Sequence, residues 1–283
     1  MAIRLIIDST CDLPRELIKD DFVTCIPLKL NIDGKDYLDG IDINTQQFFE
    51  LLKKSKNLPK TTQISQYQFE EIFKSALDKD EEILGIFLSS KLSGTFNSAR
   101  LAKEELNSNK IEIVDSTLTT FPFRALVEQA IKLIKQGLSL LEIKNKLEIL
   151  KTKIKTLAVI SDLTYLKRGG RLSSASALIA TTLHLRPIVV VENGEITAIA
   201  KIVGTGRALN AIAKMFNEKD VDFNYPIYLA DADGIELKQR FVNVLKEKTS
   251  IFNQAKEIID CTVGATTGSY TGPNCTGISF FIK

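Results

Sequence analysis

The sequence predicts an α/β protein with two α/β domains, the N-terminal one with a mainly parallel sheet flanked by helices and the C-terminal one with a mixed sheet. Strand-like and helix-like segments alternate through the first half of the chain, which is typical of a parallel sheet. In the second half, Asn193-Gly194 between two strand-like runs predicts a hairpin and therefore antiparallel pairing. The length of 283 residues also favours two domains over one.

The elements predicted for the first half follow one another in regular alternation. "IRLIID" predicts the first strand, and "FVTCIPLKLNI" predicts one long strand rich in strand formers. Two helices are predicted in "NTQQFFELLKKS" and "TTQISQYQFEEIFKSALD", with a polar loop between them, and Ser65 and Gln68 have the spacing of a capping box. "EEILGIFLSS" and "KIEIVDS" predict buried strands, followed by helices over 93–106 and about 123–136.

The second half begins after a helix that is opened by Ser139 and Glu142, again with capping-box spacing. "KTLAVISDL" starts another strand, and we place the domain boundary near Thr156, which gives domains 1–156 and 157–283. "SDLTYLKRGGRLSSASALIATTL" predicts helix on both sides of a glycine break, and "RPIVVVENGEITAIAKIV" predicts the hairpin. Further helices and strands complete a second α/β unit that ends in "CTGISFFIK". Without a low-complexity linker, the halves are expected to pack closely.

Composition and charge exclude several classes of protein. The 37 basic and 35 acidic residues leave a net charge of +2, and without a long single-sign stripe we predict no nucleic-acid binding. The first apolar run is interrupted at Asp8, and no run approaches the ~20 residues that cross a bilayer, so we expect no transmembrane segment and a cytoplasmic protein. The four cysteines fit neither a zinc site nor a disulfide framework, and we predict no metal and no cofactor.

The stretch "SSKLSGTFNSA" places a cluster of hydroxyl side chains in the connection between a predicted strand and a predicted helix. Three roles are open for Ser93: a nucleophile, an N-cap that accepts backbone N–H bonds, or part of a nest for an anion. A serine nucleophile needs a base, usually a histidine. The one histidine, His184, lies between apolar residues and favours a packed or surface imidazole, while a lysine base such as Lys91 or Lys167 keeps the option open.

The anion nest gains support from other hydroxyl-rich turns. Ser9-Thr10 follows the first strand, Ser116-Thr117 follows "IEIVD", and Thr61-Thr62 lies before the cap at Ser65. Because loops at the carboxyl ends of parallel strands converge on one crevice, these hydroxyls are expected to meet there.

Two glycine-rich segments add candidates. In "YLKRGGRLS", Gly169-Gly170 could bring Arg168 or Arg171 against a carboxylate or phosphate, and a plain helix-ending turn is the alternative. "GATTGSYTGPNCTG" matches neither a P-loop nor a dinucleotide fingerprint, and it predicts a tight backbone loop near a ligand.

Taken in order, "DSTCDLP", "TTQIS", "SSKLSGTFNSA", "VDS", "YLKRGGRLS", "LRPIV" and "GSYTGPNCTGI" resemble the DegV family over nearly the whole chain. Members are bacterial fatty-acid-binding proteins, some of which are the acyl-carrying subunit of fatty acid kinase. The resemblance implies two α/β domains with a long-chain fatty acid buried between or within them. It also implies that Thr61 and Ser93 hold the carboxylate, with Arg171 as a further neighbour.

The expected ligand-binding residues come from these loops and from the resemblance. They are Thr61, Thr62, Ser93, Gly94, Thr95, Ser116, Arg171 and Tyr270. The sequence departs from the family in two places: Tyr270 stands where the family often has histidine, and Val203 stands where an arginine is common, with Arg207 nearby. These departures bear on the handling of a phosphorylated head group more than on binding.

The function expected is that of a fatty-acid carrier, not an enzyme, which buries one acyl chain and holds its carboxylate with hydroxyl residues. One expected partner is a separate ATP-dependent kinase, which would bring magnesium and nucleotide for acyl phosphate formation. One alternative is a lipid sensor or storage protein without a kinase partner. Another is a serine-based acyl hydrolase that uses Ser93.

Overall fold

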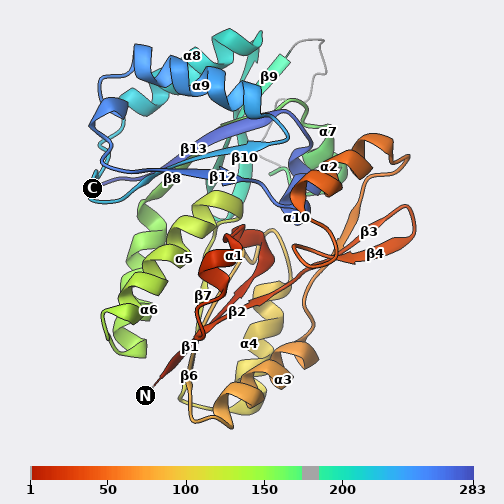
Figure 1. Ribbon diagram of the computed structural model, residues 1–283, viewed down its shortest axis with the longest axis vertical. Helices are drawn as coiled ribbons and strands as arrows, with labels where there is room; N and C mark the ends of the chain where they lie inside the picture. Colours follow the sequence, from red (N-terminus) through yellow and green to blue (C-terminus); the bar gives the residue numbers. More distant parts are fainter. Residues whose placement is uncertain (1, 174–184) are drawn as a thin grey trace.

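A four-stranded parallel sheet forms the centre of the first half of the protein. The computed structural model describes residues 2–173 and 185–283, and Figure 1 shows this sheet in its lower part. The strand order is β2-β1-β6-β7, and every neighbouring pair is parallel. The strands are β1 (Ile3–Asp8), β2 (Val23–Ile26), β6 (Glu82–Phe87) and β7 (Ile111–Asp115). The predicted parallel sheet is therefore confirmed.

Helices cover both faces of this sheet because alternate residues of each strand point to opposite sides. Ile6 packs with the pair α3 (Gln66–Leu77) and α4 (Thr95–Leu106). Leu5 and Ile7 belong to the larger core on the side of α5 and α6. These helices run over Thr120–Lys135 and Leu140–Lys153. The capping boxes predicted at Ser65 and Ser139 are both present.

The predicted long strand over "FVTCIPLKLNI" is wrong, because the chain leaves the parallel sheet at Pro27. Proline lacks an N–H and cannot continue a ladder. The part after it, β3 (Lys29–Ile32), joins a separate antiparallel sheet with β4 (Lys35–Leu38) and β5 (Lys60–Thr62). Strand β5 lies in the segment predicted as a polar loop. Helix α2 (Thr45–Lys54) connects β4 to β5.

A six-stranded mixed sheet forms the centre of the second half, as predicted. Its order is β10-β9-β8-β13-β11-β12, with β11 and β12 parallel and the other pairs antiparallel. The strands are β8 (Ile154–Val159), β9 (Leu185–Glu192), β10 (Glu195–Val203), β11 (Ile227–Ala232), β12 (Ile258–Thr262) and β13 (Cys275–Phe281). The proposed boundary at Thr156 falls inside β8, the first strand of this sheet.

Helices α8 (Thr205–Asn217) and α9 (Ile235–Lys248) cover the outer face of the mixed sheet, at the top of Figure 1. Its inner face packs on α5, which also contacts β1 of the parallel sheet. Ten of the 16 residues of α5 are buried, as expected for a helix enclosed on several sides. The two sheets therefore share one continuous core that includes Leu5, Leu126 and Tyr228.

Several short helices complete the fold near the junction of the sheets. They are η1 (Ser9–Cys11), α1 (Arg15–Ile18), α7 (Thr164–Arg168), η2 (Phe252–Gln254) and α10 (Ala265–Thr271). Helix α10 replaces the backbone loop predicted for "GATTGSYTG", and it packs on α2 and α7. The predicted helix after the glycine pair, and His184, lie outside the described residues.

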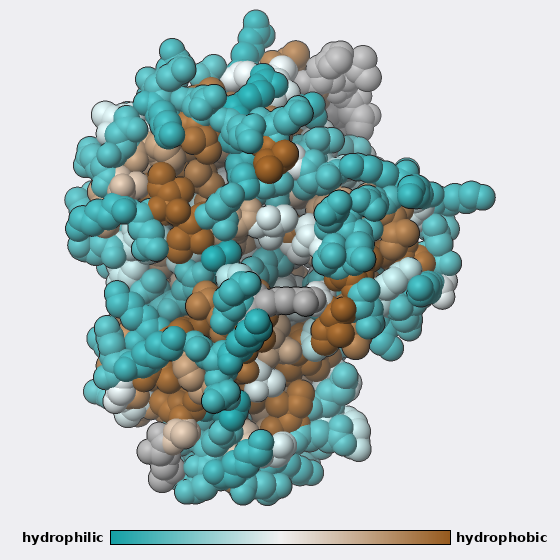
Figure 2. Space-filling view, viewed as in Figure 1, coloured by the Kyte–Doolittle hydropathy of each residue, from teal (hydrophilic) through white to brown (hydrophobic). Residues whose placement is uncertain are grey.

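The surface is mostly hydrophilic on the face seen in Figure 2, and hydrophobic side chains gather there in separate patches. Over residues 2–173 and 185–283, none of the helices combines the length and the apolar character that crossing a membrane requires.

The predicted hairpin joins β9 to β10 and also connects the two halves of the protein. Asn193 and Gly194 have φ values of 51° and 84°, as the predicted type I′ turn requires. The Ser89 hydroxyl, from the loop after β6, donates a hydrogen bond of 2.7 Å to the Gly194 carbonyl. A Cβ at position 194 would lie 2.7 Å from Ser89 Oγ, so glycine is required by both conformation and contact.

Replacing Gly194 with alanine is expected to destabilise the fold more than the same change at Gly137. Both glycines have positive φ, and a side chain there costs about 1–2 kcal/mol. Only Gly194 faces a neighbour within contact distance, which adds about 1–3 kcal/mol of overpacking. Urea denaturation of Gly194→Ala and Gly137→Ala measures the difference. Equal losses would show that the contact with Ser89 does not restrict the hairpin.

Candidate functional site

The loops at the carboxyl end of the parallel sheet are tied together by hydrogen bonds. Asp8, at the end of β1, accepts the Thr10 N–H and hydroxyl with one carboxylate oxygen and the Leu88 N–H with the other, at 3.0, 2.6 and 2.7 Å. The Ser89 N–H donates to the Leu118 carbonyl at 2.9 Å. The loops after β1, β6 and β7 therefore form one rigid edge, as expected for a ligand site in such a fold.

A small pocket opens between this edge, strand β5 and helix α10, and we call it the hydroxyl pocket. Its volume is about 30 Å³. It is lined by Thr10, Leu28, Thr61, Leu88, Leu92, Ser93, Thr119, Arg171, Ile196, Thr266, Thr267 and Tyr270. Of the eight residues expected from the sequence, the structure brings four to this pocket: Thr61, Ser93, Arg171 and Tyr270.

Tyr270 is held between Thr61 and Arg171. Its hydroxyl is hydrogen-bonded to Thr61 Oγ1, and the Arg171 guanidinium lies 4.8 Å from the centre of its ring. Arg171 is fixed in turn by hydrogen bonds to the carbonyls of Leu92 (3.1 Å) and Gly169 (2.6 Å). All three pocket side chains remain partly exposed. A hydroxyl pair and a cation thus lie side by side, which suits a carboxylate.

Ser93 stands just before helix α4, and it is not the N-cap residue. The helix begins at Thr95 with Gly94 as its N-cap, one residue later than the predicted cap at Ser93 would require. Ser93 Oγ lies 3.0 Å from Thr95 Oγ1 and accepts the Thr95 N–H at 3.3 Å. A side chain at Gly94 would collide with the side chain of Gln63, which directly follows β5. Glycine at this position therefore allows Gln63 to lie against the start of α4.

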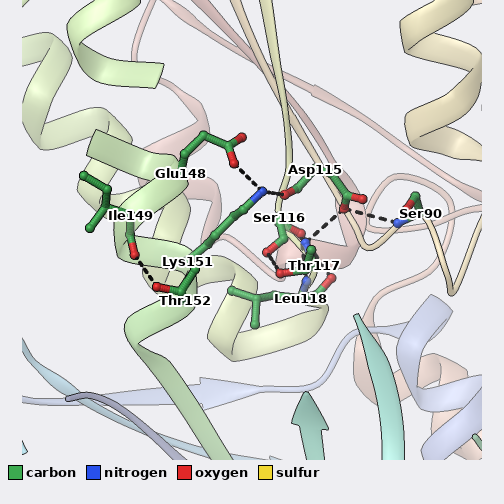
Figure 3. Close-up of polar contacts among 9 residues, drawn as sticks. All are labelled: Ser90, Asp115, Ser116, Thr117, Leu118, Glu148, Ile149, Lys151 and Thr152. Carbon is green, nitrogen blue, oxygen red and sulfur yellow. Dashed lines mark hydrogen bonds and ion pairs between the residues drawn. The ribbon is translucent and has the colours of Figure 1, made fainter. Parts of the chain in front are cut away.

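The other four expected residues do not line the pocket. Thr62 is exposed and follows Thr61 on β5, so it points to the opposite face of the strand. Gly94 is the N-cap of α4, and Thr95 is buried with its hydroxyl paired to Ser93 Oγ. Ser116 is buried within its own turn, where its hydroxyl donates to the Leu118 carbonyl at 3.2 Å (Figure 3).

The turn around Ser116 has a structural role that Figure 3 makes clear. The Asp115 carboxylate accepts the N–H groups of Ser90 (3.2 Å) and Thr117 (3.0 Å), which joins the loops after β6 and β7. Lys151 on α6 donates to the Asp115 carbonyl at 2.8 Å. Ser116 therefore belongs to the support of the site.

Sequence reasoning missed Thr119, Thr266 and Thr267. The last two precede Tyr270 by four and three residues, and on a helix this spacing places side chains on neighbouring positions of one face. The signal was hidden because the segment was predicted as a loop, whereas it forms α10.

A second cavity of about 60 Å³ lies next to the hydroxyl pocket, and we call it the apolar cavity. The two share Thr119, Ile196 and Thr267. Much of its wall comes from the mixed sheet, including Val189 on β9 and Ala230 on β11. It thus lies between the mixed sheet, the start of α5 and α10.

Threonines line this cavity without making it polar, because their hydroxyls have partners elsewhere. Thr276 donates to the Ala230 carbonyl at 2.9 Å, and Thr120 donates to the Asp12 carboxylate. Thr119 and Thr267 pair with each other at 3.3 Å. A threonine whose hydroxyl is bonded elsewhere presents its methyl group to the cavity. The wall therefore suits a hydrocarbon.

Two buried aspartates and one half-buried aspartate lie behind the cavity walls: Asp8 and Asp39 bond residues of the hydroxyl pocket, and Asp12 bonds Thr120 of the apolar cavity. Burial raises the pKa of Asp8 to about 6 and also raises the pKa of Asp12 and of Asp39 above the usual range. Asp12 and Asp39 also border an open cleft of about 780 Å³ on the far side of η1. In the described part of the chain, no group of three or more His, Cys, Asp or Glu residues is placed to hold a metal ion.

The raised pKa of Asp8 predicts a pH-dependent contribution to stability. The native protein holds this proton more tightly than the unfolded chain, so the contribution is full below about pH 4 and is lost as the pH rises through about 6. The loss is about 3 kcal/mol, because one pKa unit corresponds to ~1.4 kcal/mol. Relative to Asp8→Asn, the wild type should lose this amount between pH 4 and pH 7 in urea denaturation. A difference that is constant across this range would contradict the assignment.

Comparison with known proteins places the chain in a family. The DegV family profile matches residues 2–283. A DegV domain-containing protein of Caldanaerobacter subterraneus is 33% identical over 279 residues, which is 98% of this chain and 98% of that protein.

Solved structures agree over the full length. A DegV family protein from Thermus thermophilus, described as fatty acid binding, has a TM-score of 0.87 and 28% identity, with 100% of both chains covered. DegV of Bacillus subtilis, described as a fatty acid binding protein, has a TM-score of 0.84 and 27% identity, also over 100% of both chains. The sequence match and the shared architecture together show that this chain belongs to the DegV family.

Proposed function

We propose that this protein binds one long-chain fatty acid, with its carboxylate in the hydroxyl pocket and its chain in the apolar cavity. The observation that carries the proposal is that these two spaces, one rich in hydroxyls and one apolar, share Thr119, Ile196 and Thr267. The related proteins of known structure that are described as fatty acid binding support the same ligand class.

The energetics fit an acyl chain. Burying a carboxylate without donors is costly, and the hydroxyl pocket offers hydroxyls from three separate elements together with the Arg171 guanidinium. Each buried methylene contributes about 0.8 kcal/mol, so the chain supplies most of the affinity. The apolar cavity of about 60 Å³ is small beside the ~300–1,000 Å³ of typical ligand pockets. A long acyl chain therefore requires lining side chains to move.

We also propose that the carrier presents the carboxylate to a separate ATP-dependent kinase in the cytoplasm. The partial exposure of Thr61, Ser93 and Arg171 supports presentation of the head group. The four free cysteines suit a reducing compartment. A sensor or storage role without a kinase would use the same pocket and remains the competing proposal.

The hydrolase alternative has little support from the geometry of Ser93. In the described ranges, the hydrogen bonds of its hydroxyl go to Thr95 and not to a histidine or lysine that could act as a base. The protein is therefore proposed to bind the fatty acid and not to hydrolyse an acyl bond.

Denaturing extraction of the purified protein, followed by mass spectrometry, is expected to release about one fatty acid per chain.

Thr61→Val and Ser93→Ala should each weaken palmitate binding by about 1.5–3 kcal/mol, because each removes a hydrogen bond to a charged group. Thr62→Val, on the opposite face of the same strand, should bind like the wild type in a calorimetric titration. The proposal fails if no lipid is released and palmitate does not raise the melting temperature.

Presentation to a kinase predicts a chemical product. The protein loaded with radiolabelled palmitate, an ATP-dependent fatty acid kinase and Mg-ATP should together form an acyl phosphate, which hydroxylamine traps as a hydroxamate. Omitting either protein should abolish the product. If loaded protein gives no hydroxamate with a kinase that is active on another carrier, the storage or sensor role is favoured.

A further inference from the structure

Thr266 has a buried hydroxyl that the fold does not use. The residue is 3% exposed and lines the hydroxyl pocket. Within residues 2–173 and 185–283, its Oγ1 makes no hydrogen bond. A buried hydroxyl without a partner costs about 1–3 kcal/mol. This unused donor therefore indicates that the pocket receives an acceptor from outside the chain.

The neighbouring hydroxyls of the pocket are engaged in the protein itself. Thr10 donates to Asp8, Thr61 is paired with Tyr270, and Ser93 is paired with Thr95. In the last two pairs either hydroxyl can be the donor, so Thr61 and Ser93 are free to donate to a ligand when Tyr270 and Thr95 donate to them. Thr266 differs from them, although it stands on α10 one turn before Tyr270 and shares the pocket with Thr61, Ser93 and Arg171.

The backbone of Thr266 is fixed independently of its side chain. Its N–H donates to the Asp39 carboxylate at 3.3 Å, and Ser9 donates to the same oxygen at 3.1 Å. Asp39 is buried and thus anchors the start of α10. No hydrogen bond of normal geometry joins the Thr266 hydroxyl to Asp39. The hydroxyl nevertheless lies close enough to lower the pKa of the Asp39 carboxyl, so Asp39 is the protein group that competes with a ligand for the Thr266 hydroxyl proton.

A carboxylate has acceptor capacity for more donors than Thr61 and Ser93 supply. Its two oxygens offer about four lone-pair sites, and inside a protein each unfilled site leaves the charge less stabilised. Two N–H groups of Arg171 already donate to backbone carbonyls. A third hydroxyl donor at Thr266 would fill a site from the α10 side.

We propose that Thr266 is a third hydroxyl ligand of the fatty-acid carboxylate, held in place by the contact of its backbone with Asp39. This inference rests on the proposed function and adds a specificity-determining residue to the same site. The hydroxyl favours an anionic head group over a neutral one of the same chain length, because a hydrogen bond to a charged acceptor is the stronger.

The test compares Thr266→Val, which keeps the shape and removes the donor, with Thr266→Ser, which keeps the donor. Ser269→Ala is the matched control: Ser269 is buried on the same helix, donates to the Ala265 carbonyl at 2.9 Å and lines neither cavity. Palmitate should bind Thr266→Val roughly 10- to 100-fold more weakly than wild type. Thr266→Ser should recover most of the affinity, and hexadecanol should show a smaller loss.

Two further readouts separate a ligand role from a structural one. In ¹³C NMR of bound [1-¹³C]palmitate, the carboxyl pKa should be higher in Thr266→Val, because a donor to the charged form has been removed. The ligand-free variant should melt at the same or a higher temperature than the wild type, since an unpaired buried hydroxyl is gone.

Two results would overturn the inference. One is palmitate affinity and carboxyl pKa equal to wild type in Thr266→Val. The other is a lower melting temperature without ligand and no change in carboxyl pKa, which would assign the hydroxyl to Asp39. In either case, the proposed function stands as long as the wild-type protein binds palmitate. If the wild-type protein itself does not bind palmitate, the proposed function fails.

Discussion

The arrangement of the site depends on the burial of the Asp8 carboxylate at the end of β1. A carboxylate that lies out of contact with water must be surrounded by donors, and here they come from two different loops, through Thr10 and Leu88. This requirement joins the turn after β1 to the strand end of β6. The position of Ser93, five residues beyond Leu88, follows from the same connection. Rigid support from a polar group behind a binding pocket keeps the ligand contacts in place.

The same rule explains why a polar pocket and an apolar cavity can adjoin. Along the wall, the threonine hydroxyls that turn away to backbone carbonyls or carboxylates leave methyl groups inside, as at Thr276. At the junction, the hydroxyls of Thr119 and Thr267 satisfy one another. The chemical character of the lining is therefore decided by where each hydroxyl finds its partner, and the residue type alone does not determine it.

The sequence predicted the two sheets, the hairpin and the capping boxes because each depends on local patterns: period, turn residues and cap spacing. It also identified Thr61, Ser93, Arg171 and Tyr270, which the structure brings together in one pocket. It could not separate Thr61 from Thr62, because that choice depends on β5, whose three residues are too few to show a period. Ser116, like Ser93, lies in a hydroxyl-rich turn after a strand, but its hydroxyl donates to the Leu118 carbonyl within that turn. Thr266 was hidden by the glycines around it, which predict a loop, although tertiary contacts with α2 and α7 hold the segment as a helix.

The contacts that build the pocket join residues very far apart along the chain. Thr61 and Tyr270 are separated by 209 positions, and Ser89 and Gly194 by 105. Contacts of such separation form late, because the long intervening chain must first be closed into a loop. The pocket therefore arises only when both halves have folded and docked. Under the proposed function, a nascent or partly folded chain would expose the apolar lining without the groups that hold the carboxylate, so fatty-acid binding would begin only when folding is complete.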